Sequence, residues 1–156
     1  QRALVPSAKV AQAAALACVG GVEARNNVLT GLTSADDDDV QVAQVYLRHR
    51  PITTVEEVRL VTTGVAKMRV PAAQVRALDT LARQRLSDRE SIDALAKLFP
   101  VAESVNVQRA IAGVIIRADY HALEKPEMAR VLAESRLKSS GGDDIIDILI
   151  RRLRAP

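Results

Sequence analysis

The chain has 156 residues, of which 48% are hydrophobic and 26% are charged, so it can bury a core and is not a disordered chain. Aromatic residues make up only 2% and tryptophan is absent, so Ala, Val, Leu and Ile must build that core, which suits closely packed helices. The net charge of +3, from 22 cations and 19 anions, permits an acidic partner without requiring one.

The cysteine count and the hydropathy exclude two further classes of protein. Cys18 is the only cysteine, which excludes an internal disulfide framework and a thiolate zinc site and favours a reducing compartment, so we expect a cytoplasmic protein. No apolar run approaches the roughly 20 residues that span a membrane, so we expect no membrane partner. We interpret residues 1–156 as a single domain, and the start at Gln1 without Met indicates a fragment of a longer chain.

Boundary residues in the first third of the chain predict helices at 7–19, 22–32 and 40–48. The first of these ends at Gly20 and Gly21, because glycine readily adopts the backbone conformation that closes a helix. The third follows four aspartates at 36–39, whose negative charge favours a helix N-terminus. The glycine-turned loop of a calcium site is absent here, so we predict a helix cap and no bound metal.

The middle third predicts three more helices, at 54–68, 72–86 and 87–99. Thr54 followed by Glu57 forms a capping box, in which each residue satisfies a free backbone N–H of the other, and Ser87 with Glu90 forms a second one. Pro100 ends the last of the three, since proline cannot continue a helix.

The last third predicts helices at 104–118, 126–138 and 143–153. Pro126 would occupy the first helical position, where its missing N–H is not needed, and Asp143 and Asp144 would place negative charge at the start of the final helix. Apolar residues at helical spacing support the first of these helices: Val107, Ala110, Ile111, Val114, Ile115 and Ala118.

Similar segments recur along the chain. The segment at 39–43 matches the one at 106–110 in having a short polar residue, then Val-Gln, then Ala. Val40, Val75 and Val107 recur at intervals of 35 and 32 in the numbering. Two helices of about 12 residues and two turns fill such a period, so we predict a repeat protein built from helix pairs.

The segments at 40–48, 75–83 and 107–117 resemble the second helix of HEAT repeats, which begins with Asp, then Val-Arg or Val-Gln, then Ala and aliphatic residues. Armadillo and other helical-pair repeats have similar sequences. The resemblance covers nearly the whole chain and leaves 7–19 as an unpaired second helix. It implies an all-α fold, a right-handed α–α superhelix of about nine antiparallel-paired helices, with the second helices on the concave face and a scaffold or docking role.

A row of arginines follows the same period. Arg48, Arg83, Arg117 and Arg151 recur at intervals of 35, 34 and 34 in the numbering, at or near the ends of second helices. In a stack of repeats, matching positions would lie about 10 Å apart and form a cationic ladder. Such a ladder could bind an acidic peptide or a phosphate backbone through forked hydrogen bonds. Neutralisation of the helix dipole explains much of the pattern without a ligand, and it is the simpler interpretation.

Other candidate residues for chemistry have simpler explanations. His49 and His121 have no metal-ligand spacing and are expected at the surface, and Cys18 lies on an alanine-rich face without a nearby base, as a small core residue would. Glycine-rich phosphate loops, nucleophile motifs and paired carboxylates are absent. We therefore predict no catalytic residues, no metal and no cofactor.

Three functions remain open at this point. The first is a non-catalytic docking module for another protein, which could have an acidic surface. The second is nucleic-acid binding, as in helical-repeat DNA glycosylases, where only Tyr46 and Tyr120 could stack on a base. The third, ranked last, is a bilin-attaching lyase, a class in which HEAT-like repeats also occur. Self-association through exposed apolar residues of the terminal helix at 143–153 is a further expectation.

Overall fold

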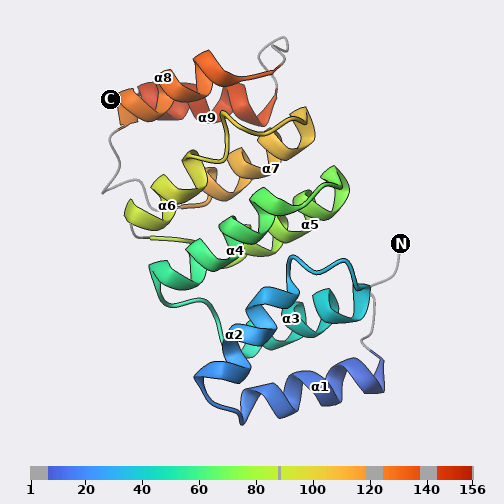
Figure 1. Ribbon diagram of the computed structural model, residues 1–156. Helices are drawn as coiled ribbons and strands as arrows, with labels where there is room; N and C mark the ends of the chain where they lie inside the picture. The colour runs from blue at the N-terminus through green and yellow to red at the C-terminus, as the bar shows by residue number, and fades with distance from the viewer. Residues whose placement is uncertain (1–6, 88, 119–124, 138–143, 156) are drawn as a thin grey trace. The chain divides into compact units, whose positions relative to one another are not determined.

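The computed structural model describes residues 7–87, 89–118, 125–137 and 144–155 (Figure 1). Within these residues there are nine helices and no strand, which confirms the all-α class. The helices are α1 (Ala8–Cys18), α2 (Val22–Gly31), α3 (Asp37–His49), α4 (Val55–Lys67), α5 (Pro71–Ala82), α6 (Arg89–Ala96), α7 (Val105–Ile116), α8 (Lys125–Ser135) and α9 (Ile145–Arg154). In the described part of the chain, every helix is too short or too polar to span a membrane.

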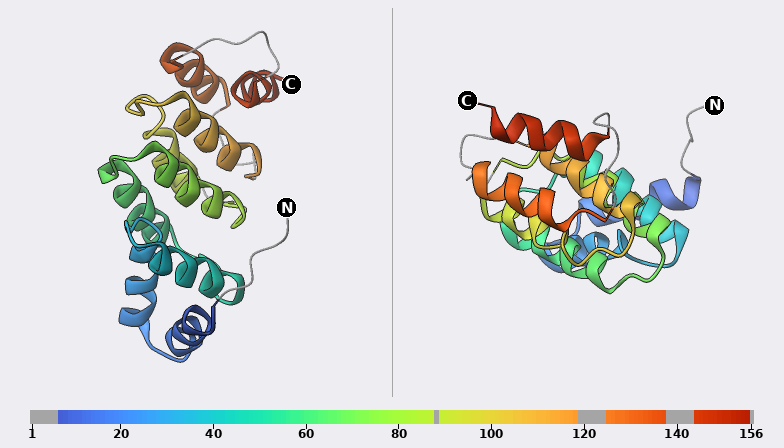
Figure 2. Two further views of the ribbon diagram at one scale, coloured as in Figure 1. Left: turned by 90° about the vertical axis from the view of Figure 1, so that its right-hand side faces the viewer. Right: turned by 90° about the horizontal axis from the view of Figure 1, so that it is seen from above.

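The chain divides into two compact units, unit 1 at residues 1–64 and unit 2 at residues 65–156. The division falls inside α4, and each unit is described by itself. In unit 1, α1 lies alongside α3 and α2 packs against both (Figure 1). In unit 2, α7 lies between α5 and α9, while α6 packs on α7 and α8 packs on α9 (Figures 1 and 2).

Helix starts in unit 1 follow the local capping chemistry of the sequence. The Ser7 side chain accepts a hydrogen bond from the Val10 N–H and begins α1. The Asp36 carboxylate accepts one from the Asp38 N–H at 2.8 Å, so α3 begins at Asp37, three residues earlier than predicted. Three aspartates therefore lie in the first turn of α3, which confirms the predicted helix cap.

The capping box at Thr54 is also confirmed. The Glu57 N–H donates to Thr54 Oγ1, and the Thr54 N–H donates to Glu57 Oε1, each at 3.3 Å. In unit 2, Ser104 and Asp144 cap α7 and α9 in the same way, through side-chain oxygens that accept from backbone N–H groups. The second predicted capping box, at Ser87, adjoins residue 88, which lies outside the described residues, and α6 begins at Arg89.

Helices α5 to α8 in unit 2 all end before the predicted residue. Helix α5 ends at Ala82 rather than at residue 86, because the Arg83 and Gln84 N–H groups bond three residues back, and Arg85 then adopts a φ of 52°, outside the helical region. The turn carries Leu86, which is only 7% exposed, back into the core. Helix α6 ends at Ala96 instead of Phe99; the Leu98 and Phe99 N–H groups instead bond three residues back, in a tight turn that buries the Phe99 ring.

The apolar residues of α9 are a further correction. We predicted exposed apolar side chains there, yet Ile146, Leu149, Ile150 and Leu153 are buried. They are covered because α9 packs on both α7 and α8. Ile145 and Ile148 of the same helix are half-buried, and self-association through them stays a prediction. Large exposed apolar side chains instead include Leu16, Val19 and Val22 around the α1–α2 turn in unit 1.

Helix boundaries recur at a regular interval along the sequence, but the predicted equivalence of the repeated valines is wrong. The N-cap residues Asp36, Val70 and Ser104 are evenly spaced in the sequence, and the C-cap residues Arg83 and Arg117 of α5 and α7 keep the same interval. Val75 is the fifth residue of α5 and half-buried, whereas Val107 is the third residue of α7 and buried. The two valines therefore occupy different positions of the repeat.

Glutamines, not valines, share equivalent positions in the two repeats of unit 2. Gln74 and Gln108 are each the fourth residue of their helices. The Gln74 amide donates to the Val65 and Met68 carbonyls at the end of α4, and the Gln108 amide donates to the Phe99 carbonyl after α6. In both repeats, a side chain of the second helix thus satisfies the free carbonyls at the end of the first.

Candidate partner-binding groove

An open groove of about 600 Å³ runs between α5 and α7 in unit 2 and reaches the start of α9. Its lining combines small or apolar residues with a few polar and charged side chains. The lining residues are Pro71, Ala72, Val75, Asp79, Asn106, Arg109, Ala110, Gly113, Arg117 and Ile145.

The groove lies between two helices of equal length, α5 and α7. Both have 12 residues and lie side by side, and Figure 1 shows them running in the same direction. Asp79 and Gly113 are each the ninth residue of their helix, so they face the groove at one level. Arg83 and Arg117, one turn further on, follow the last residues of the two helices.

Gly113 makes the floor of the groove hollow. A Cβ atom built at this position would have one neighbour within 4 Å among the described residues, Ile145 Cδ1 at 3.8 Å. That is an ordinary van der Waals distance, so the backbone does not require a glycine here. The missing side chain instead leaves space on the groove side of α7, next to Ala110.

Arg109 is a fixed part of the groove wall. Its Nε donates to Asp144 Oδ2 at 2.5 Å, and its Nη1 donates to the Asn106 side-chain oxygen at 3.1 Å. Asp144, with a side chain only 7% exposed, also accepts from the Ile146 N–H as the cap of α9. Burial alone would raise the pKa of Asp144, but these hydrogen bonds hold it below its ordinary value. Arg109 therefore joins α7 to α9 and is not a free cation.

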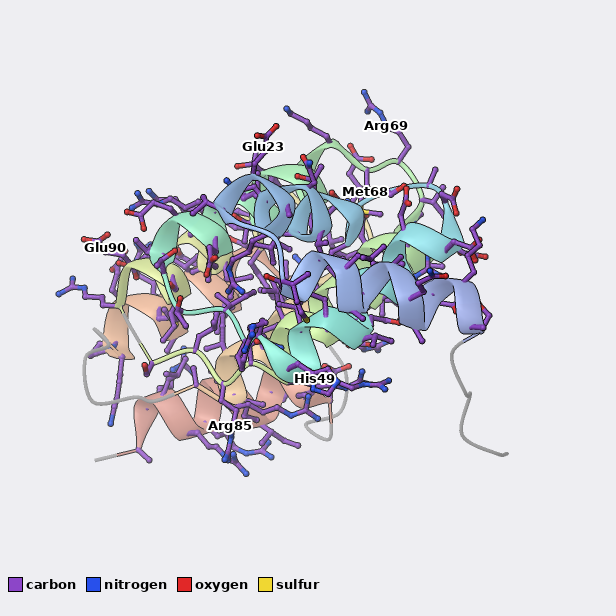
Figure 3. The ribbon with its side chains drawn as sticks, turned by 90° about the horizontal axis from the view of Figure 1, so that it is seen from below. Glu23, His49, Met68, Arg69, Arg85 and Glu90 are labelled. Carbon is purple, nitrogen blue, oxygen red and sulfur yellow. The ribbon has the colours of Figure 1, made fainter. Side chains whose placement is uncertain are left out.

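A cationic edge adjoins the groove where α5, α7 and α9 end. Arg83 and Arg117 are the C-cap residues of α5 and α7, and Arg151 lies in the last turn of α9. All three are exposed, as are three more arginines at the same helix ends. The six residues, which we call the arginine edge, are Arg83, Arg85, Arg117, Arg151, Arg152 and Arg154. Figure 3 shows the Arg85 side chain extending away from the ribbon.

The charge at this edge exceeds what the helix ends require. Each helix C-terminus carries about half a negative elementary charge, so three helices need fewer than two cations. The arginine edge supplies six. Arg83 and Arg117 have no ion pair with any residue that the structure describes, and Arg117 also lines the groove. Dipole neutralisation therefore explains only part of the edge.

The four arginines of the predicted ladder are divided between the two units. Arg83, Arg117 and Arg151 lie at neighbouring helix ends in unit 2. Arg48 belongs to unit 1, where it is exposed in the last turn of α3 beside His49. The exposed position of His49 is confirmed and is visible in Figure 3, whereas His121 lies outside the described residues.

Sequence reasoning missed an ion pair in unit 1. The Arg25 guanidinium on α2 donates to both carboxylate oxygens of Glu57 on α4 and to the Arg50 and Pro51 carbonyls after α3. The Arg25 and Glu57 side chains are only 19% and 12% exposed. The hydrogen bond from Arg25 lowers the pKa of Glu57 from 4.5 to about 2, and Glu57 in turn raises the pKa of Arg25.

Tyr46 belongs to the same cluster. Its side chain is only 3% exposed, its hydroxyl accepts from Arg25 Nη1, and the guanidinium carbon lies 5.7 Å from the ring centroid. The ring is therefore covered and cannot stack on a base, which removes one of the two tyrosines considered for that role. Tyr120, the other, lies outside the described residues.

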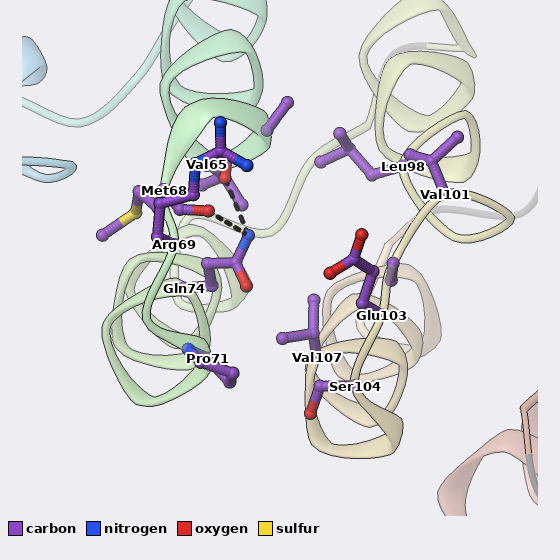
Figure 4. Close-up of a pocket in the computed structure, with 12 residues that line it drawn as sticks. Val65, Met68, Arg69, Pro71, Gln74, Leu98, Val101, Glu103, Ser104 and Val107 are labelled. Atoms are coloured by element: carbon purple, nitrogen blue, oxygen red, sulfur yellow. Dashed lines mark hydrogen bonds between the residues drawn. The ribbon is translucent and has the colours of Figure 1, made fainter.

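A second hollow in unit 2 has few charged side chains in its described lining. A cleft of about 270 Å³ lies between the α4–α5 and α6–α7 turns, where Gln74 donates to the Val65 and Met68 carbonyls and Glu103 is the one carboxylate in the described lining (Figure 4). Among the residues with described positions, no three His, Cys, Asp or Glu side chains form a potential metal site. Cys18 is half-buried and therefore less enclosed than the core residue we predicted.

Comparisons of this chain with protein-family models, with curated proteins and with solved structures give no match. The groove and the arginine edge are therefore the features of the molecule that bear on its function.

Proposed function

We propose that this chain is a non-catalytic protein-docking module, a HEAT-like stack of helix pairs whose groove in unit 2 binds an acidic segment of another protein. The observation that carries the proposal is the position of Arg117, an exposed guanidinium at the end of a groove with a small, apolar floor. The floor favours apolar contact, and the cation favours a carboxylate.

The packing inside each unit supports a HEAT-like arrangement. In unit 1, α1 lies against α3, and in unit 2, α5, α7 and α9 lie in sequence, so alternate helices of the chain are neighbours within each unit. The even spacing of the N-cap residues Asp36, Val70 and Ser104 fits a repeat of two helices and two turns. Within each unit, alternate helices would then supply one binding face, as the second helices of such repeats do.

The mixed character of the groove favours protein over nucleic acid. Asp79 lines the groove and would repel a phosphate backbone, and the covered Tyr46 ring cannot contribute base stacking. The arginine edge alone could bind phosphates, which makes nucleic-acid binding the alternative. The net charge of +3 supplies little long-range attraction for it.

The test compares the wild type with two doubly charge-reversed variants in affinity capture from cell extract. Arg83→Glu with Arg117→Glu alters the arginine edge beside the groove. Arg69→Glu with Lys97→Glu is the matched control, because these exposed residues lie in the turns after α4 and α6, outside the groove. We expect a protein that the wild type and the control retain and the edge variant loses.

Binding of that purified protein is then measured by calorimetry against all three forms. Equal binding to the edge variant and the wild type would overturn the proposal. A different result, retention of duplex DNA with steep salt dependence that the edge variant abolishes, would replace it with the nucleic-acid alternative.

A further inference from the structure

We infer that the groove selects a segment that carries both a basic and an acidic residue, the basic residue opposite Asp79 and the acidic residue opposite Arg117. The inference rests on the proposed docking function and deepens it, because it states which acidic segments can enter the groove. A segment with acidic residues alone would meet Asp79 and be disfavoured.

Asp79 is the one carboxylate in the described lining of the groove. It is exposed on α5 and has no ion pair with a described residue. A bound segment would remove water from this carboxylate, which is unfavourable unless the segment supplies a cation or a donor in return. Asp79 therefore discriminates between partners, since it accepts a basic residue and repels an acidic one.

Arg117 sets the second position. It follows the last residue of α7 and lines the same groove as Asp79. The neighbouring cation on α5, Arg83, lies four residues beyond Asp79, which places it about 6 Å further along the helix axis. Arg83 therefore adds positive charge to the same end of the groove at which Arg117 lies.

The two charged positions lie on different walls of the groove, Asp79 on α5 and Arg117 at the end of α7. A segment lying in the groove would therefore meet a carboxylate on one side and a guanidinium on the other. Gly113 lies level with Asp79, and Ala110 and Val75 lie about one turn earlier, so this part of the floor can accept an apolar or small side chain. Because Arg109 is bound to Asp144, it adds no free charge to the floor.

A displayed library of random short peptides tests this inference. The full 156-residue chain is used as wild type, Asp79→Lys, Arg117→Glu and the control Arg69→Glu. We expect the wild type and the control to enrich peptides that carry both a basic and an acidic residue. In the peptides that Asp79→Lys enriches, an acidic residue should take the place of the basic one. In the peptides that Arg117→Glu enriches, a basic residue should take the place of the acidic one.

Synthetic peptides then give the size of the change in binding affinity. The best wild-type peptide should bind Asp79→Lys about tenfold more weakly, and changing its basic residue to Glu should restore the affinity. If Asp79→Lys enriches the same peptides as the wild type, the inference is overturned while docking stands. If the wild type enriches no peptide family that the Arg83→Glu with Arg117→Glu variant loses, the docking function fails as well. Circular dichroism of each variant establishes that the helices are intact.

Discussion

Arginine and carboxylate side chains occur together in both units, but their surroundings differ. In unit 1, Arg25 and Glu57 are mostly buried and meet each other, two carbonyls and a tyrosine. In unit 2, Asp79 and Arg117 line one groove, are exposed, and lack an ion pair with any described residue. The first pair holds helices together, whereas the second leaves charge available to a partner. Burial and the number of existing partners thus separate structural charges from binding charges.

Replacing Glu57 should have the largest effect on stability. Glu57→Ala removes the partner of a mostly buried guanidinium and also the capping box of α4, so we expect a loss of about 3 kcal/mol in the free energy of unfolding. Glu56→Ala, in the same turn of the same helix but exposed, should cost less than about 0.5 kcal/mol. Urea denaturation of the two variants measures the difference, and equal midpoints would show that the Arg25 cluster is not structural.

The same ion pair makes stability depend on pH in the acid range. The pKa of Glu57 falls from 4.5 to about 2 on folding, mainly because Arg25 donates to the carboxylate. The folded state therefore binds fewer protons than the unfolded state between these values, so the contribution is present above pH 4.5 and is lost as the pH falls toward 2. It amounts to about 3 kcal/mol.

Unfolding of the wild type and Glu57→Gln is compared at neutral pH and near pH 2. The stability difference between them should shrink as the pH falls, since the glutamine cannot titrate. A difference that stays constant over this range would contradict the assignment to Glu57.

Two glycines, Gly64 in unit 1 and Gly113 in unit 2, should respond to alanine in opposite ways. A Cβ at Gly64 on α4 would collide with the Thr33 side chain, so Gly64→Ala should destabilise the fold by about 1.5 kcal/mol. A Cβ at Gly113 meets only an ordinary contact, so Gly113→Ala should stabilise α7 by about 0.5 to 1 kcal/mol. Thermal unfolding of the two variants measures both changes in stability. Destabilisation by Gly113→Ala would show that the space beside Gly113 is already filled by packed side chains.

The Gly113→Ala methyl group would also occupy the groove floor, so this variant should bind a groove ligand more weakly.

Helix starts were predictable because their causes are local. Ser7, Ser104 and the Thr54 capping box each involve hydrogen bonds between residues at most three apart, and a sequence displays such pairs directly. The end of α5 was not predictable, since Arg85 takes a positive φ without the glycine that usually indicates one. A buried Leu86 beyond it decides that turn, and burial depends on tertiary packing.

The candidate site was predictable only in part. The regular spacing of the arginines was visible in the sequence and matches the C-cap residues Arg83 and Arg117. Asp79 and Gly113 were missed, although the same interval separates them, because a carboxylate and a glycine share no sequence pattern. The valine register misled because Val75 lines the groove, whereas Val107 is part of the buried side of α7. Correct alignment of the helices was needed to recognise the groove.

Arg117 should have the smallest effect on stability and a large effect on binding. Arg117→Ala removes an exposed cation from the end of α7, so we expect a loss of only about 0.3 kcal/mol, from the helix dipole. Arg25→Ala, which removes the same side chain from a mostly buried site, should cost several times more. Denaturation midpoints of the two variants measure this contrast. If Arg117→Ala destabilised the chain as much as Arg25→Ala, the guanidinium at the groove would be a structural charge, and the distinction between the two units would fail.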